Sequence, residues 1–233
     1  IHALICIGGD GSLSTSLQLQ KVGVHVVGVP KTIDNDILAT ASTFGFDSAV
    51  TCVVDGLDRL HTTARSHKRI MVVETMGRHA GWIALHGGLA GGADAILIPE
   101  IPFSYSKVAA FAKERVSSGI SSTMIVVAEG AIPAQGQLST IHSGLRGKGE
   151  VRLGGMGEQV AREMEKRTGQ ETRHVVLGHL QRGGNPTALD RILGTRFGIG
   201  AVELVVKNKF GFMVSYQNYE IGGVPISEAV ARI

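Results

Sequence analysis

The chain has 233 residues, of which 43% are hydrophobic and 18% charged, and this balance excludes a disordered or fibrous protein. The 23 basic and 20 acidic residues leave a net charge of only +3, and no run of Lys and Arg is typical of a nucleic-acid or membrane-surface site. The two cysteines, Cys6 and Cys52, form no CxxC motif and no apolar run is long enough to span a membrane, so we expect a cytoplasmic protein.

Apolar runs of strand length alternate with helix-length segments along most of the chain. The chain opens at Ile1 directly in an apolar run without an initiator Met, which suggests a fragment. We expect strands at His2–Ile7, His25–Val29, Arg69–Glu74, Ala95–Ile98, Thr123–Ala128, His174–Leu177 and Phe212–Tyr216. We expect helices up to about Gln20 and over Ser48–Ser66, Trp82–Leu89, Ser106–Ser117, Glu158–Arg167 and Asp190–Lys207. The alternation predicts an α/β fold with mostly parallel sheets.

The first strand is followed by the glycine-rich segment Gly8–Ser12, which reads GGDGS and precedes a helix. Such a loop lets a phosphate approach backbone amides at a helix N-terminus. It matches neither the P-loop pattern nor GxGxxG, so the common mononucleotide folds are not indicated. The alternative is a tight turn in which Asp10 caps the helix.

The second strand is followed by Thr32–Asp36, which places two carboxylates two residues apart beside a hydroxyl. Phosphoryl transfer to an alcohol requires one acid as general base and another near Mg²⁺. Together with Asp10, three carboxylates could then surround one metal–phosphate centre. The alternative is an Asx turn and a helix cap, which commonly explain such residues in a loop.

Further polar residues stand where later strands end, and the carboxyl ends of parallel strands are where ligands collect in such sheets. The candidates there are Met76–Arg78, Glu129 and His179–Arg182. Five basic residues near strand ends, converging on one face of a sheet, would suit a substrate with several phosphates, and the alternative is ordinary surface charge. They are Arg69, Arg78, Arg173, His179 and Arg182. The histidines show no metal-ligand spacing, so zinc is not expected.

Four motifs together resemble the 6-phosphofructokinase family, in the family's order and from about residue 3 to residue 220. They are GGDGS at Gly8–Ser12, PKTIDND at Pro30–Asp36, ETMGR at Glu74–Arg78 and GHLQRGG at Gly178–Gly184. The last three are specific to the family, whereas GGDG also occurs in NAD kinases and lipid kinases, a rival class. The resemblance implies Mg²⁺-dependent transfer of a phosphoryl group from ATP to the 1-hydroxyl of fructose 6-phosphate, a glycolytic step that gives fructose 1,6-bisphosphate.

The resemblance also implies two Rossmann-like three-layer domains with the active site in the cleft between them. The donor domain is expected to comprise residues 1–45 and 181–215, without the family's N-terminal portion. The fructose 6-phosphate domain is expected to comprise residues 46–180 and 216–233. Because the donor site would be incomplete, we expect this piece alone to be inactive.

The resemblance implies a role for each residue that matches a functional position in the family's motifs. Asp34 matches the general base that takes the proton from the sugar 1-hydroxyl, and Thr32 and Arg78 match groups that stabilise the transferring phosphoryl. Asp10 and Asp36 match acids associated with Mg²⁺. Residues matching the fructose 6-phosphate site are Met76, Gly77, Arg78, Glu129, His179 and Arg182. Residues matching the donor site are Gly9, Asp10, Gly11, Ser12 and Lys31.

Arg69 and Arg173 match arginines that reach the sugar phosphate from a neighbouring subunit, so the resemblance implies a homo-oligomer, a dimer or tetramer, with shared active sites. The chain also departs from the short bacterial pattern by an insertion between Glu129 and Arg173. Lys31 is typical of pyrophosphate users whereas Gly11 is typical of ATP users, so a pyrophosphate-dependent enzyme is the alternative. A non-catalytic regulatory subunit that binds sugar phosphates is a more distant one.

Overall fold

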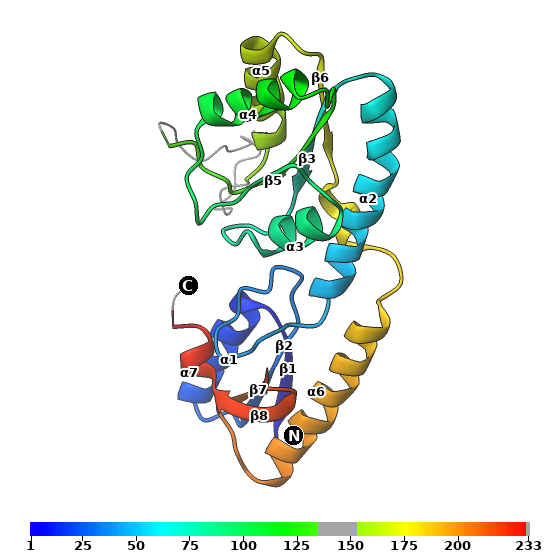
Figure 1. The fold of residues 1–233 in the computed structure, drawn as a ribbon. Coiled ribbons are helices and arrows are strands. Elements are labelled where there is room, and N and C mark those ends of the chain that lie inside the picture. The colour runs from blue at the N-terminus through cyan, green and yellow to red at the C-terminus, as the bar shows by residue number, and fades with distance from the viewer. Residues whose placement is uncertain (135–152, 232–233) are drawn as a thin grey trace. The chain divides into compact units, whose positions relative to one another are not determined.

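The computed structural model describes residues 1–134 and 153–231. The contacts divide the chain into two compact units: unit 1 is Ile1–Ser48 with Asn185–Ile233, and unit 2 is Ala49–Gly184. Each unit contains one four-stranded, mostly parallel sheet with helices packed on it (Figure 1). The α/β fold with mostly parallel sheets that the sequence predicts is therefore confirmed.

The sheet of unit 1 has the strand order β1-β2-β7-β8. Its strands are β1 (Leu4–Gly8), β2 (Val26–Pro30), β7 (Phe212–Gln217) and β8 (Glu220–Pro225). The first three are parallel, and β8 runs antiparallel to β7. Strand β2 is buried at every residue because it lies inside the sheet, whereas β1 forms an edge and exposes Leu4 and Ile7.

Helices cover both faces of this sheet, because successive side chains of a strand point to opposite faces. On β7, Val214 packs with Phe197 of α6 (Ala188–Val206), while its neighbour Met213 packs with Leu13 of α1 (Asp10–Lys21). The short helix α7 (Ile226–Ala229) adds Ile226 to the core on the α1 side. Unit 1 is thus a three-layer structure.

The sheet of unit 2 is parallel throughout, in the order β4-β5-β3-β6. Its strands are β3 (Ile70–Thr75), β4 (Ala95–Leu97), β5 (Thr123–Ala128) and β6 (Thr172–Val176). Every residue of β3 and β5 is buried, as expected for central strands covered on both faces. Because all four strands point the same way, the loops that follow them meet at one edge.

Two pairs of helices complete the layers of unit 2. The core between α4 (Tyr105–Ser117), α5 (Met156–Thr168) and the sheet includes Ile125 and Val160. The other face is covered by α2 (Phe46–Ser66) and α3 (Trp82–Ala90), where glycines of α3 let Val53 of α2 and Ile96 of β4 approach closely. Over the described parts of the chain, no helix combines the length and the apolar character needed to cross a membrane.

The expected assignment of residues 216–233 to the second domain is wrong in this structure, because β8 pairs with β7 along its length and α7 joins the core of unit 1. Strand β8 was not expected from the sequence. Asn218 and Tyr219 both take positive φ (49° and 66°), the geometry of a tight hairpin turn, but Tyr replaces the usual glycine at its second position. The other expected boundaries lie within a few residues of those observed.

Residues 135–152, which lie within the region between Glu129 and Arg173 where the insertion is expected, are outside the described residues. Within the described part, Phe103 and Pro133 form an isolated parallel bridge, and Ala131 is buried in the core of unit 2. Residue Gly155 takes a left-handed conformation (φ 81°) immediately before α5.

Candidate functional site

The residues that the sequence singles out fall into three groups in the structure. One group lies at the carboxyl ends of β1 and β2 in unit 1, a second at the carboxyl ends of β3, β5 and β6 in unit 2, and a third at the amino ends of β3 and β6.

In unit 1, the glycine-rich segment begins helix α1 earlier than expected. Asp10 is the first helical residue and Gly9 occupies the N-cap position, so Asp10 is not the side-chain cap that the alternative interpretation required. The first helical hydrogen bond runs from the Leu13 amide to the Gly9 carbonyl (3.0 Å), and the amides of the preceding turn are not used by the helix itself. Such a terminus favours an anion.

The Thr32–Asp36 segment after β2 is held by hydrogen bonds within its own loop. The Thr32 hydroxyl accepts a bond from the Asp34 amide (3.1 Å) and donates to Asp34 Oδ2 (3.4 Å). The Asn35 side chain accepts from the Thr43 amide (2.9 Å), and the Thr43 hydroxyl donates to the Thr32 carbonyl (2.8 Å). Asp34 is buried in this loop, with 7% of its surface exposed.

The two loops of unit 1 lie against each other. The Lys31 amide donates to the Gly8 carbonyl (2.9 Å), and a methyl group on Gly9 would lie 3.4 Å from Thr32 Cβ. The Lys31 side chain is exposed. A side chain at Gly11 would meet no atom within 4 Å, so the protein itself leaves the space beside this position open.

The donor groups at this edge fit a magnesium ion held jointly with phosphate oxygens. Asp10 and Asp36 supply carboxylate oxygens, the ligands that Mg²⁺ prefers, and it commonly uses only one or two of them with substrate phosphates. Over residues 1–134 and 153–231, no three His, Cys, Asp or Glu side chains form a cluster that could hold a metal by themselves.

In unit 2, the turn Met76–Arg78 follows β3 in a conformation that needs its glycine. Gly77 has φ 140° and Arg78 has φ 53°, both in the left-handed half of the map. The Arg78 amide donates to Glu129 Oε1 (2.9 Å) from the end of the adjacent strand β5. A methyl group on Gly130 would overlap the Arg78 carbonyl, so this close packing also needs a glycine.

Burial raises the pKa of the Glu129 carboxyl above its usual value, and the charge of Glu74 raises it further. The amides of Arg78 and Gly77 and the charge of Arg182 act in the opposite direction. Glu129 is therefore bonded to the turn after β3 and feels the charge of Arg182 in the segment after β6.

The segment after β6 forms a short 3₁₀ helix, η1 (Gly178–Arg182), on which His179 and Arg182 are exposed. Between them, Gln181 has only 2% of its surface exposed. Its Oε1 accepts from the Met76 amide (3.3 Å) and its Nε2 donates to the Gly178 carbonyl (3.1 Å). Gln181 thus ties two loops together, a role that the sequence did not reveal although the residue stands inside the GHLQRGG motif.

Glu74 is a second residue that sequence reasoning missed. It is buried in β3 with 4% of its surface exposed, and its carboxylate accepts from the amides of Gly157 (2.7 Å) and Gly155 (3.3 Å) at the start of α5. A carboxylate at a helix N-terminus is stabilised by the helix dipole and the amides. In the sequence, Glu74 could have been singled out as an acidic residue in an otherwise mostly apolar strand.

Arg69 and Arg173 do not lie with the other basic residues. Arg69 precedes β3 and Arg173 is the second residue of β6, whereas Arg78, His179 and Arg182 follow the opposite ends of these strands. A six-residue strand separates its ends by about 17 Å. Within a single chain, the five basic residues therefore lie at two opposite edges of the sheet and do not converge at one.

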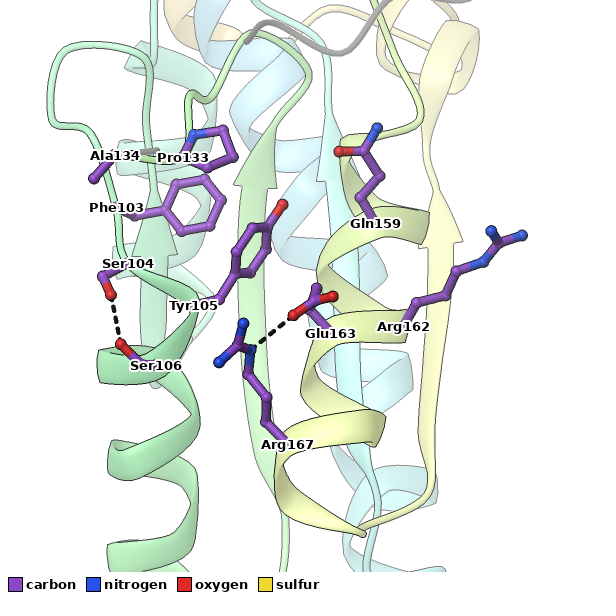
Figure 2. Close-up of a pocket in the computed structure, with 10 residues that line it drawn as sticks. All are labelled: Phe103, Ser104, Tyr105, Ser106, Pro133, Ala134, Gln159, Arg162, Glu163 and Arg167. Atoms are coloured by element: carbon purple, nitrogen blue, oxygen red, sulfur yellow. Dashed lines mark hydrogen bonds and ion pairs between the residues drawn. The ribbon is translucent and has the colours of Figure 1, made fainter. Parts of the chain in front are cut away.

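Unit 2 also contains a cavity of about 640 Å³ between the start of α4 and one face of α5 (Figure 2). Its lining includes Tyr105, Glu163 and Arg167. Glu163 and Arg167 form an ion pair (2.7 Å) on the surface of the cavity. The Arg167 guanidinium lies 5.9 Å from the centre of the Tyr105 ring. None of the predicted site residues lines this cavity.

Comparison with protein families matches residues 1–205 to the phosphofructokinase model. An ATP-dependent 6-phosphofructokinase of Chloroflexus aurantiacus is 52% identical over 233 residues, which cover all of this chain and 64% of that protein. A pyrophosphate–fructose 6-phosphate 1-phosphotransferase of Streptomyces coelicolor is 53% identical over 234 residues, covering all of this chain and 68% of that protein. Overall identity therefore does not separate the two phosphoryl donors.

Solved structures agree with these matches. The crystal structure of Pichia pastoris phosphofructokinase in the T-state superposes with a TM-score of 0.85 at 34% identity, over 99% of this chain and 25% of that one. The chain spans about two thirds of the length of the curated relatives named here.

Proposed function

This chain belongs to the phosphofructokinase family, and we propose that it carries the residues that transfer a phosphoryl group from ATP to the 1-hydroxyl of fructose 6-phosphate. The product is fructose 1,6-bisphosphate, and we propose that the reaction takes place in the cytoplasm. The observation that carries the proposal is the burial of the Asp34 carboxylate in a hydrogen-bonded loop. A buried carboxylate at the end of a parallel strand, with its loop held by Thr32, Asn35 and Thr43, is suited to take a proton from an alcohol.

Positioning and charge stabilisation are the main contributions that a protein makes to phosphoryl transfer. We propose that Thr32 and Arg78 stabilise the transferring phosphoryl, and that Asp10 and Asp36 hold Mg²⁺ together with the donor phosphates. Bound Mg²⁺ would neutralise charge on those phosphates. The amides of the first turn of α1, beside Gly9, Gly11 and Ser12, bind phosphate oxygens in this proposal, because they lie outside the helix's own hydrogen bonds.

The acceptor sugar is proposed to bind at the carboxyl edge of the unit 2 sheet. The exposed side chains of His179 and Arg182 are donors suited to the 6-phosphate. Met76, Gly77 and Glu129 then contact the sugar, and Glu129 accepts hydrogen bonds from its hydroxyl groups. The glycine-dependent turn and the Gln181 bonds support this role, because they keep the three loops in one arrangement.

We propose that Arg69 and Arg173 serve the site of a neighbouring subunit in a homo-oligomer. They lie at the amino edge of the sheet, about 17 Å from the residues that hold the sugar in their own chain. A dimer or a tetramer that brings this edge to the carboxyl edge of another copy would complete the phosphate site.

ATP is the proposed donor, because Gly11 leaves open the space that a nucleotide α-phosphate needs. The pyrophosphate-dependent reaction is the second candidate, and the exposed Lys31 favours it, since a flexible point charge can attract phosphate of either donor.

The test of the central proposal is Asp34→Asn in the full-length protein. An amide keeps the size of the side chain but cannot take a proton, so turnover should fall about 10²–10⁴-fold while the KM for fructose 6-phosphate changes little. Asp58→Asn on the exposed side of α2 is the matched control and should leave turnover unchanged. Near-normal turnover in Asp34→Asn would remove the general-base assignment.

The test of the donor is Gly11→Asp, with ATP and pyrophosphate compared in each variant. A Cβ at this position would meet no atom within 4 Å, so we attribute the effect of the substitution on ATP use to the ligand. We expect ATP use to be lost through crowding and repulsion of the α-phosphate. Gly198→Asp on α6, where a Cβ also meets no atom within 4 Å, controls for the general cost of an aspartate in a helix. A wild-type protein that uses pyrophosphate and not ATP would overturn the donor assignment.

A further inference from the structure

A single carboxylate joins the two arginines at the amino edge of the unit 2 sheet. Glu171 Oε2 lies 2.7 Å from Arg69 Nε, and Glu171 Oε1 lies 2.5 Å from Arg173 Nη2. Each carboxylate oxygen therefore holds one guanidinium group. The three side chains are partly exposed, at 27% for Arg69, 40% for Glu171 and 56% for Arg173.

The backbone fixes where this carboxylate stands. The Ile70 amide, next to Arg69, donates to the Glu171 carbonyl (3.1 Å), and the register then pairs Ile70 with Thr172 and Met71 with Arg173. Glu171 is thus held between the starts of two adjacent parallel strands.

We propose that Glu171 is a positioning residue that holds the guanidinium groups of Arg69 and Arg173 at a spacing in which both can bind one phosphate group of a sugar phosphate. The proposal rests on the function proposed above for these two arginines. Each guanidinium carries five N–H donors, and the carboxylate engages one nitrogen of each, so further donors remain for a phosphate. Without the carboxylate, two long and flexible cations would repel each other and separate.

The structure also allows an opposing role, and the two roles predict opposite signs. If Glu171 only neutralised the arginines, its removal would leave more positive charge and tighten phosphate binding. If Glu171 positions them, its removal weakens phosphate binding although the local charge becomes more positive. The direction of the change in affinity therefore separates the two roles.

The experiment measures KM for fructose 6-phosphate and kcat in the full-length protein for Glu171→Ala and Glu171→Asp. We expect Glu171→Ala to raise KM about tenfold, the scale seen when an outer partner of a binding residue is removed, with kcat nearly unchanged. Glu171→Asp, which keeps the carboxylate, should restore part of the affinity. Glu158→Gln, which breaks the exposed Glu158–Arg162 pair on α5, is the control and should change neither constant.

The Arg69→Ala, Arg173→Ala double variant tests the proposed role of the two arginines separately from that of Glu171. Raised KM in this variant supports the proposed role of the arginines, and adding Glu171→Ala to it should then have no further effect. Unchanged KM in the double variant would contradict the arginine assignment, and the positioning role with it. Raised KM in the double variant combined with unchanged or lowered KM in Glu171→Ala would overturn the positioning role alone.

Discussion

Each end of the unit 2 sheet carries a glutamate in contact with predicted substrate-binding residues. The pKa values of the two glutamates are shifted in opposite directions. At the carboxyl edge, burial raises the pKa of Glu129. At the amino edge, the hydrogen bond from Arg69 lowers the pKa of Glu171, with the charges of Arg173 and His67 acting in the same direction. The same residue type therefore meets two electrostatic environments on one sheet.

The difference shows how each edge is built. The carboxyl edge is held by backbone: a left-handed turn at Gly77, amides donating to Glu129, and a glycine at position 130 that lets the Arg78 carbonyl pack closely. The amino edge is held by ion pairs between partly exposed side chains. We expect substitutions at the carboxyl edge to change the geometry of the site, and substitutions at the amino edge to change mainly its affinity for anions.

Among substitutions that compare the two edges, Gly130→Ala has the largest expected effect. Its methyl group would overlap the Arg78 carbonyl, so the turn that carries Arg78 must move, and a misplacement of about 1 Å can cost roughly 10²-fold in activity. We expect kcat/KM for fructose 6-phosphate to fall by about that factor in the full-length protein. Circular dichroism and thermal unfolding would show whether the variant remains folded.

Gly198→Ala is the matched glycine control. It lies on α6, where a methyl group meets no atom within 4 Å, so activity should not change and the helix should gain roughly 0.5–1 kcal/mol. A folded Gly130→Ala variant with wild-type kcat/KM would contradict the backbone-built description of the carboxyl edge.

The next prediction concerns whether the two edges of one chain serve two different active sites in an oligomer. Arg182→Ala removes a phosphate donor from the carboxyl edge and Arg69→Ala removes one from the amino edge, so each variant alone should be weakly active. If sites are shared between two copies, a mixed dimer has one intact site. Random pairing of equal amounts should then restore about a quarter of the wild-type activity.

The measurement is activity after the two variants are unfolded together and refolded, compared with each variant refolded alone. A mixture no more active than its components would mean that Arg69 and Arg182 of one chain serve the same site, and it would contradict the proposal that sites are shared between subunits.

Much of the architecture follows from the sequence because the central strands are continuous apolar runs. Ile70–Thr75 and Thr123–Ala128 are buried along their whole length and were expected within one residue of their observed bounds. The edge strand Glu220–Pro225 has two glycines and a proline and lacks this pattern, so its hairpin and its place in unit 1 were missed.

The candidate site follows from the sequence only where motifs carry it. The motifs place Asp34, Arg78 and Arg182 at strand ends, and their roles remain predictions. The supporting contacts of Gln181 and Glu171 could not be predicted, because they depend on which strands are neighbours and on their register. Strand order is a long-range property that no local pattern contains.

The smallest expected effect is a pair of opposite pH trends in stability. For Glu129, whose pKa is raised in the folded state, stability is highest below the unfolded carboxyl pKa and declines as pH rises through the folded value. Glu129→Gln can still accept the Arg78 amide bond but does not ionise, so its thermal unfolding temperature should rise relative to wild type as pH increases from about 4 to 7.

For Glu171, whose pKa is lowered, the stabilising contribution is present above the unfolded pKa and disappears as pH falls through the folded value. Glu171→Gln should therefore lose stability relative to wild type as pH rises over the acid range, by a small amount because the pairs are exposed and screened. Thermal scans of both variants in low and high salt test this, and salt should reduce the Glu171 trend more. Parallel trends in the two variants would mean that the two edges do not differ electrostatically as described.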